Sequence, residues 1–222
     1  MVAAGAQTTL VVCAPFVFLP ILKKIGLSAR LSLGVQDVSA FFGGAHTGDV
    51  SGEMAKDAGA RYAIVGHSER RAMGESNALI NQKIICALSA PLTPILCVGE
   101  RDRDHGVWYL HEIKKQLEEC LAGIPRAKIS SVVIAYEPVW AIGKDAVRET
   151  TPEECREMMI YIRKVLADSH GAKIAHAVRI LYGGSVDEKN GASYLSAGSA
   201  DGLLPGRLSL EPKKMEKLLT TL

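Results

Sequence analysis

Two short segments of the chain end on side chains that can move protons. Residues 64–71 read Ile-Val-Gly-His-Ser-Glu-Arg-Arg and place His67 directly after a short apolar run. Residues 134–143 read Ile-Ala-Tyr-Glu-Pro-Val-Trp-Ala-Ile-Gly and place Glu137 in the same way. In chains of parallel strands, active sites form at the carboxyl ends of the strands. The two segments therefore predict a base and an electrophile.

His67 is followed by a polar sequence, Ser-Glu-Arg-Arg, that predicts the start of a helix. The positive end of a helix disfavours an imidazolium, so we expect a neutral imidazole that donates a hydrogen bond. A histidine packed on a loop without a catalytic role is an equal alternative, because single histidines are common.

Glu137 is surrounded in the sequence by apolar residues, among them Tyr136, Val139 and Trp140. Apolar neighbours raise the pKa of a carboxyl group and make its carboxylate a better base. The alternative is a glutamate at a strand end that pairs with an arginine or lysine. A charge among so many apolar neighbours needs a reason, which favours the functional interpretation.

Two glycine-containing turns follow the last two apolar runs. Residues 178–185 read Val-Arg-Ile-Leu-Tyr-Gly-Gly-Ser, and residues 201–207 read Asp-Gly-Leu-Leu-Pro-Gly-Arg. Glycines let backbone N–H groups approach an anion such as phosphate. One such turn is usually only a turn, but two in these places match the usual phosphate site of a (β/α)-barrel. The polar segment 143–150 is either a lid over substrate or an ordinary surface loop.

These residues lie in a chain where short apolar runs alternate with amphipathic stretches. The predicted strands are residues 9–13, 31–35, 62–65, 93–98, 131–135, 179–182 and 200–204, and the clearest predicted helices are 73–88, 108–121, 152–166 and 212–219. Repeated strand–helix units imply parallel strands joined by right-handed crossovers. Because no Gly-x-Gly-x-x-Gly turn follows the first strand, we expect a (β/α)8 barrel rather than an open doubly wound sheet. We expect one domain over residues 1–222.

Composition excludes several classes of protein. The chain has 222 residues, 48% hydrophobic content and a net charge of +2, without a basic stripe that would indicate nucleic acid as a partner. No apolar run approaches the roughly 20 residues that cross a membrane, and no signal peptide is recognisable. The five cysteines form no CxxC pair, which favours reduced thiols in the cytoplasm over disulfides or a metal site.

Several segments together resemble the triosephosphate isomerase family. They are residues 44–51 (Gly-Ala-His-Thr-Gly-Asp-Val-Ser), 66–71 (Gly-His-Ser-Glu-Arg-Arg), 94–100 (Pro-Ile-Leu-Cys-Val-Gly-Glu), 136–143 (Tyr-Glu-Pro-Val-Trp-Ala-Ile-Gly) and 182–185 (Tyr-Gly-Gly-Ser), in the family's order. The resemblance runs from about Thr9 to the C-terminus. It implies an α/β fold of the (β/α)8 TIM-barrel type and an aldose–ketose isomerase of glycolysis and gluconeogenesis that works without a cofactor or metal.

The resemblance also implies roles for individual residues. Glu137 would be the base and neutral His67 the electrophile, a pairing that is inherited from the family and not worked out from this sequence. Glu69 would support the site by hydrogen bonding, and Tyr182 would latch the closed lid. The backbone at four positions would hold the substrate phosphate: Gly143, Ser185, Gly206 and Arg207. The segment 43–51, with Thr47 near its tip, would enter a neighbouring subunit of a homodimer.

The sequence departs from the family's pattern in three places. The family opens with a strand that resembles Asn-Trp-Lys-Met-Asn, whereas only a short non-matching segment, residues 1–8, precedes the run at 9–13. We therefore expect the first βα unit and its catalytic lysine to be missing, at a cost on the order of 10²–10³ in rate. Arg207 replaces the second glycine of a Gly-Gly pair, where its guanidinium would either add a phosphate contact or obstruct the site. Residues 144–149 are more charged than the family's Thr-Gly-Lys lid tip.

These departures leave three hypotheses. The first is a triosephosphate isomerase, or a sequence derived from one, that retains its base and electrophile but has impaired activity and weakened dimerisation. For the missing unit we expect a truncated gene model or a splice form. The second is a barrel that binds phosphorylated metabolites or partner proteins with little catalysis. The third is another sugar-phosphate enzyme on the same scaffold.

Overall fold

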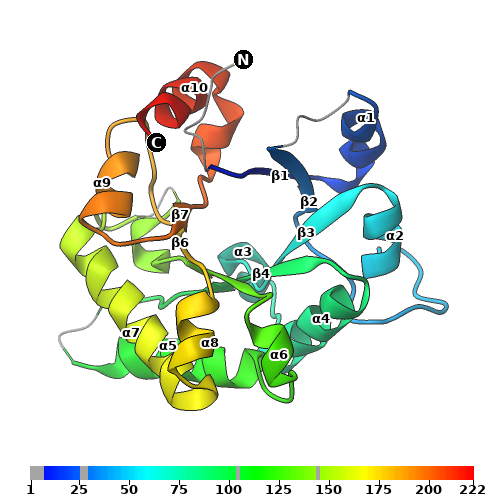
Figure 1. Cartoon of the computed structure of the whole chain (residues 1–222), viewed down its shortest axis with the longest axis horizontal. Helices are drawn as coiled ribbons and strands as arrows, with labels where there is room; N and C mark the ends of the chain where they lie inside the picture. Colours follow the sequence, from blue (N-terminus) through cyan, green and yellow to red (C-terminus); the bar gives the residue numbers. More distant parts are fainter. Residues whose placement is uncertain (1–7, 26–29, 104–105, 144–145) are drawn as a thin grey trace. The chain divides into compact units, whose positions relative to one another are not determined.

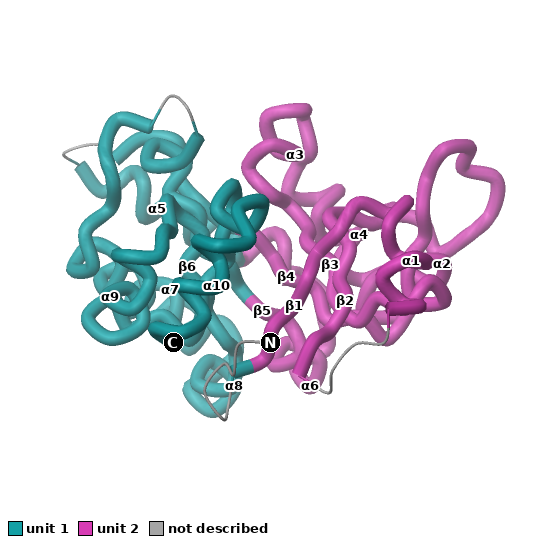
Figure 2. Tube along the Cα trace, turned by 90° about the horizontal axis from the view of Figure 1, so that it is seen from above, with its two compact units in different colours: residues 1–8, 98–117, 134–222 teal, residues 9–97, 118–133 magenta. Residues whose placement is uncertain are grey.

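The computed structural model describes residues 8–25, 30–103, 106–143 and 146–222. The chain divides into two compact units, shown in teal and magenta in Figure 2. Unit 1 contains Val98–Leu117 and Ile134–Leu222, and unit 2 contains Thr9–Cys97 and Glu118–Val133. The single domain expected over residues 1–222 stays a prediction. The N-terminal segment 1–8 lies almost entirely outside the described residues.

All seven predicted strands are present in the described part of the chain, each within two residues of its predicted bounds. Their order in the sheet is the order of the chain. Unit 2 holds β1 (Leu10–Ala14), β2 (Leu31–Val35), β3 (Ala60–Val65) and all but the last residue of β4 (Thr93–Val98). Unit 1 holds β5 (Val133–Tyr136) from its second residue, β6 (Ile180–Tyr182) and β7 (Gly202–Leu203). The pairings within each unit are parallel (Figure 1).

The central strands are mostly apolar, as expected for parallel strands that are covered on both faces. In β4, with the sequence Thr-Pro-Ile-Leu-Cys-Val, every residue after the threonine is buried. By contrast, Ala14 is the only buried residue of β1, and Val12 is 38% exposed. Within the described residues, β1 pairs only with β2 and β7 only with β6, as expected for the two ends of the strand order.

Helices follow the strands in both units. They are α1 (Leu19–Lys24), α2 (Gly52–Asp57), α3 (Ser68–Ala72), α4 (Asn77–Ser89), α5 (Trp108–Cys120), α6 (Arg126–Ile129), α7 (Pro152–His170), α8 (Ala172–Ala177), α9 (Gly191–Ser196) and α10 (Pro212–Thr221), with 3-10 turns η1 (Phe16–Phe18), η2 (Val139–Ala141) and η3 (Arg207–Leu210). The helix predicted from residue 73 was wrong at its start. Gly74 adopts a left-handed φ of 100°, and the Ser76 hydroxyl then caps α4 by accepting from the Leu79 N–H.

Helix α7 begins with a capping box. The Thr151 hydroxyl accepts from the Glu154 N–H at 3.2 Å, and the Glu154 carboxylate accepts from the Thr151 N–H at 2.9 Å. Pro152 occupies the first turn, where its missing N–H costs nothing. The helix continues to His170 and ends at Gly171, whose φ of 88° an L-residue rarely adopts.

Replacing Thr151 by alanine is expected to lower the free energy of unfolding by about 1 kcal/mol, since it removes one half of this reciprocal cap. Urea denaturation followed by circular dichroism measures the change. Thr151→Ser retains the hydroxyl and is the matched control. Equal stability of the alanine and serine variants would contradict the assignment.

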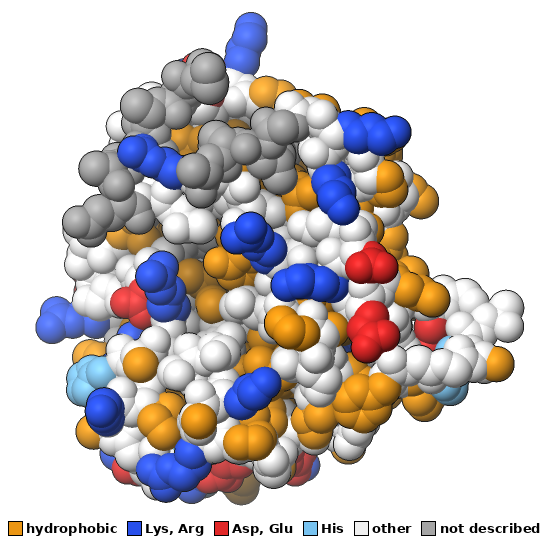
Figure 3. Space-filling view, turned by 45° about the vertical axis from the view of Figure 1, so that its right-hand side comes forward, with side chains coloured by type: hydrophobic (Ala, Val, Ile, Leu, Met, Phe, Trp, Pro, Cys, Tyr) orange, Lys and Arg blue, Asp and Glu red, His pale blue; other side chains and the backbone are white. Residues whose placement is uncertain are grey.

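The described residues contain no helix that is long and apolar enough to cross a membrane. They also contain no group of three or more metal-ligating side chains close enough to hold an ion. All five cysteines fall within the described ranges and are free thiols. On the face in Figure 3, Lys and Arg side chains are spread among hydrophobic and neutral atoms.

Candidate active site

Glu137 follows directly after β5 and is 3% exposed. Its N–H donates to the Val98 carbonyl at 2.8 Å, which extends the ladder past the ends of the strands. The neighbouring backbone comes so close that only glycine fits at position 99. A Cβ atom on Gly99 would lie 1.8 Å from the Glu137 carbonyl oxygen. The backbone of Glu137 therefore packs directly against Gly99, the residue that follows β4.

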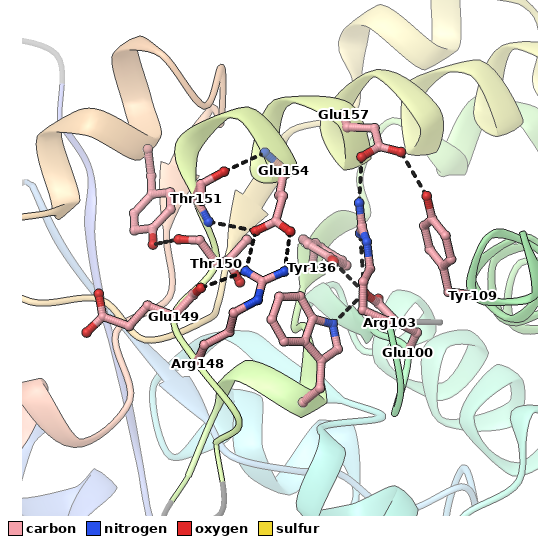
Figure 4. Close-up of polar contacts among 12 residues, drawn as sticks. Glu100, Arg103, Tyr109, Tyr136, Arg148, Glu149, Thr150, Thr151, Glu154 and Glu157 are labelled. Atoms are coloured by element: carbon pink, nitrogen blue, oxygen red, sulfur yellow. Dashed lines mark hydrogen bonds and ion pairs between the residues drawn. The ribbon is translucent and has the colours of Figure 1, made fainter. Parts of the chain in front are cut away.

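A second buried carboxylate supports the residues on either side of Glu137. The Glu100 side chain is fully buried, and its Oε1 accepts from the Tyr136 hydroxyl and from the Trp140 Nε1–H, both at 2.8 Å (Figure 4). The Val139 N–H donates to the Glu100 carbonyl at 3.0 Å. Burial raises the pKa of Glu100, and the hydrogen bonds from Trp140 and Tyr136 oppose that rise.

Sequence reasoning assigned no role to Glu100, although a signal was present. Glu100 lies one glycine after the end of β4, and Glu137 lies directly after the end of β5. Both glutamates therefore follow an apolar strand. Arg103 lies 3.5 Å from the Glu100 carboxylate and also pairs with Glu157 of α7. The Tyr109 hydroxyl donates to Glu157 at 2.8 Å (Figure 4). This chain of contacts links the buried carboxylate to the long helix.

The Gly-Gly-Ser turn lies against Glu137. The Gly183 N–H donates to the Tyr136 carbonyl at 2.8 Å, and a Cβ atom on Gly183 would lie 3.1 Å from the Glu137 Cγ. The Ser185 hydroxyl donates to the Ala141 carbonyl at 2.7 Å. The turn therefore contacts the predicted base at one end and Ala141 of the Trp-Ala-Ile-Gly segment at the other.

The second predicted phosphate turn reaches the same segment through Arg207. The Arg207 Nη2 donates to the Gly143 carbonyl at 3.1 Å, and the side chain is otherwise exposed. Gly206 accepts from both the N–H and the hydroxyl of Ser209, at 3.0 and 2.7 Å, which shapes the turn. Arg207 thus lies beside the predicted phosphate-binding backbone of Gly143.

Tyr182 is fully buried and stacks on Tyr194 with 4.0 Å between the ring centroids. Its hydroxyl makes no hydrogen bond of normal geometry within the described residues, although the Thr150 and Tyr194 hydroxyls are its neighbours. Burial raises the pKa of Tyr182 far above its usual value. The Tyr194 hydroxyl donates to the Thr150 carbonyl at 2.6 Å. The tyrosine that holds the end of the predicted lid segment in this structure is therefore Tyr194.

His67 belongs to unit 2, where it forms the N-cap of α3. Its Nδ1 accepts from the Glu69 N–H at 3.3 Å. The Glu69 carboxylate is 88% exposed and 3.9 Å from Nδ1, too far for a hydrogen bond. Arg71 holds the preceding turn by donating to the carbonyls of Gly66 and Cys97, at 2.8 and 3.1 Å.

The predicted site residues therefore fall into two groups. One group lies in unit 1 and consists of Glu137, Gly143, Tyr182, Ser185, Gly206 and Arg207, and the other lies in unit 2 and consists of His67 and Glu69. Unit 1 connects a buried carboxylate to two glycine-containing turns suited to an anion. Unit 2 presents the imidazole of His67 at the N-terminus of α3. Within unit 1, a carboxylate beside such turns can move a proton next to a bound anion.

Comparison with known proteins assigns the chain to a family. The sequence model of triosephosphate isomerase matches residues 1–222. The chain is 44% identical to triosephosphate isomerase of Thermus thermophilus over 218 residues, which is 96% of this chain and 85% of that protein. It is 40% identical to the enzyme of Moorella thermoacetica, covering 93% of this chain and 82% of that one.

A solved structure gives the same result. The crystal structure of triosephosphate isomerase from Bartonella henselae superposes with a TM-score of 0.84 at 31% identity, covering 96% of this chain and 85% of that one. The fold predicted from the alternating strands and helices is thereby confirmed as the TIM-barrel type. The chain belongs to the triosephosphate isomerase family.

Proposed function

We propose that this protein interconverts dihydroxyacetone phosphate and glyceraldehyde 3-phosphate through an enediolate, without a cofactor. Glu137 removes a proton from the carbon beside the carbonyl and returns it to the neighbouring carbon. Neutral His67 donates its Nε2 hydrogen bond to the carbonyl oxygen and moves protons between the two oxygens. No atoms are gained or lost, since the proton that leaves one carbon is returned to the other.

One observation carries this proposal above the others. Glu137 is 3% exposed, and its Cγ packs against Gly183 of the Gly-Gly-Ser turn. A base beside an anion-binding turn suits a small substrate that carries both an acidic C–H group and a phosphate. The family membership supports the same reaction.

The phosphate is proposed to bind to the backbone N–H groups of Gly143, Ser185, Gly206 and Arg207. The contacts Ser185–Ala141 and Arg207–Gly143 support this assignment because they join the two turns to the end of the same segment. The Arg207 guanidinium adds a positive charge beside Gly143, which favours a phosphate contact over an obstruction. Glu69 is proposed to act on His67 through its N–H, which donates to Nδ1 at 3.3 Å.

The segment 143–150 is proposed to cover the bound substrate, because water around the enediolate allows phosphate to be eliminated. Its tip residues 144 and 145 lie outside the described part of the chain. The role of Tyr182 as a latch stays part of this proposal. Its buried hydroxyl, beside Thr150, supports a hydrogen bond that forms when the segment moves.

The proposed function is tested by assaying the purified chain for isomerisation of glyceraldehyde 3-phosphate, coupled to reduction of the ketone product. We expect the wild-type chain to turn over the substrate and a Glu137→Gln variant to lose this activity. Binding of a phosphate-bearing enediolate analogue is measured in parallel by calorimetry. Tight analogue binding without turnover would replace this proposal by a barrel that only binds phosphorylated metabolites.

We also infer a homodimer in the cytoplasm. Figure 1 shows the loop between β2 and α2 extending beyond α2, and residues 41–49 of this loop are exposed. Contacts within the loop fix its conformation. The rings of Phe41 and His46 stack with 3.7 Å between their centroids, and the Ser39 hydroxyl donates to the Asp49 carboxylate at 2.7 Å. A preformed projecting loop with exposed Phe42 suits insertion into a second copy. The five free thiols support a reducing compartment.

Replacing Thr47 near the tip of this loop by arginine is expected to raise the dimer dissociation constant by about 30-fold or more, the effect of disrupting an interface hot spot. Sedimentation velocity over a concentration series measures the change. Thr220→Arg, at an exposed position of α10, is the control. A monomeric wild-type protein at micromolar concentration would contradict the dimer.

A further inference from the structure

Arg148 lies just before α7 and holds Glu154 of that helix through both ends of its guanidinium. Nη1 donates to the Glu154 Oε2 at 2.8 Å and Nη2 donates to Oε1 at 2.5 Å (Figure 4). Nη1 also donates to the Glu149 carbonyl at 3.0 Å. Glu154 is the same residue that completes the cap of α7 with Thr151. The bidentate geometry orients the plane of the guanidinium as well as its position.

The oriented guanidinium lies over the ring of Trp140, with its central carbon 4.6 Å from the ring centroid. The adjacent backbone makes a second contact, since the Val147 N–H donates to the Trp140 carbonyl at 2.8 Å. Arg148 and Val147 thus contact Trp140 through its ring and its backbone. At its other edge, the indole N–H donates to buried Glu100 at 2.8 Å. The indole is therefore held from both sides.

Trp140 lies three residues after Glu137, in the 3-10 turn η2 that directly follows the proposed base. The position of Trp140 therefore constrains the path of the chain that leaves Glu137. Misplacing a catalytic group by 1 Å can cost far more in rate than the contact contributes to stability. A half-exposed arginine can for this reason have a kinetic effect larger than its effect on folding.

We propose that Arg148 is a positioning residue for the isomerisation: by bridging Glu154 of α7 and the indole of Trp140, it holds the turn that follows Glu137. This role rests on the proposed function. Arg148 falls within residues 144–149, where the sequence departs from the family's lid pattern. Lysine cannot replace it, because an ammonium lacks both the fork that matches a carboxylate and the plane that stacks on a ring.

Steady-state kinetics of four variants test the role. Arg148→Met keeps the aliphatic bulk, and we expect kcat to fall three- to tenfold with KM within twofold of wild type. Arg148→Lys should recover less than half of that loss. Glu154→Gln keeps the helix cap but removes the charge, and should resemble Arg148→Met. The control is Arg156→Met, an exposed arginine of α7 for which the described residues show no ion pair or hydrogen bond.

A readout independent of turnover follows from the tryptophan content of the chain. The protein contains two tryptophans, so Trp108→Phe leaves Trp140 as the single emitter. In that background we expect Arg148→Met to shift the Trp140 emission maximum and to lower its anisotropy, and Arg156→Met to change neither. Unchanged emission with unchanged kcat would overturn the proposal.

The outcomes separate this role from the proposed function itself. A wild-type protein without isomerase activity would overturn the proposed function, and the positioning role with it. An active wild type whose Arg148→Met variant melts at a lower temperature but keeps its kcat would overturn only the positioning role, since the bridge would then be merely structural. A rise in KM with unchanged kcat would also overturn the positioning role, because it would place Arg148 in substrate binding.

Discussion

Replacing Glu137 by glutamine is expected to lower kcat by a factor on the order of 10³, the contribution of a general base to proton abstraction from carbon. The amide has almost the same shape as the carboxylate, so the packing against Gly183 and the contact with Gly99 are retained. KM should therefore change little, because the variant loses a group that acts in the transition state. The coupled assay gives both constants.

Hydrogen exchange in heavy water shows which step is lost. The proton held by Glu137 can exchange with the solvent before it is returned to carbon, so the wild-type protein should introduce deuterium at a carbon-bound position. The glutamine variant should introduce it at a rate lowered as much as kcat. Glu153→Gln, an exposed glutamate in the first turn of α7, is the matched control. A Glu137→Gln variant with more than a tenth of the wild-type kcat would show that another group is the base.

Replacing Gly99 by alanine is expected to destabilise the protein by about 3 kcal/mol, at the upper end of what overpacking costs. The added methyl group would lie 1.8 Å from the Glu137 carbonyl oxygen and 2.7 Å from its carbonyl carbon. Both obstacles are backbone atoms, so no side chain can rotate away. The backbone of Glu137 must move instead, and we expect kcat to fall at least tenfold in the protein that remains folded.

Urea denaturation and the coupled assay measure the two effects separately. Gly43→Ala is the control, because a Cβ atom at Gly43 would have no atom within 4 Å. An alanine variant at position 99 with wild-type stability and kcat would show that the backbones of Gly99 and Glu137 lie farther apart than they do here. Loss of kcat without loss of stability would still support a coupling between the two residues.

The strands were predicted well because their signal is local. A parallel strand covered on both faces is a continuous apolar run, and the runs 31–35 and 93–98 coincide with β2 and β4. The start of α4 was predicted four residues too early, because apolar periodicity continues through the turn that Gly74 and Ser76 form. The start of α7 was predicted at its observed residue, Pro152, since a helix N-terminus is recognised by neighbouring residues.

The site was predicted only in part. The sequence named Glu137 and the Gly-Gly-Ser turn as candidates, and the structure packs the two against each other. It assigned no role to Glu100, which joins Tyr136 and Trp140 across 36 and 40 residues. It also left out Tyr194, whose hydroxyl reaches the Thr150 carbonyl across 44 residues.

The sequence by itself determined the family, the alternating α/β fold and the candidate base and electrophile, because motifs and apolar runs are properties of neighbouring residues. Only the tertiary structure decided that Glu100 is the shared acceptor for two flanking aromatic residues and that Arg148 lies between Glu154 and Trp140. Such contacts depend on where a side chain meets a distant part of the chain after folding. The spacing of residues along the sequence does not show which distant side chains come into contact.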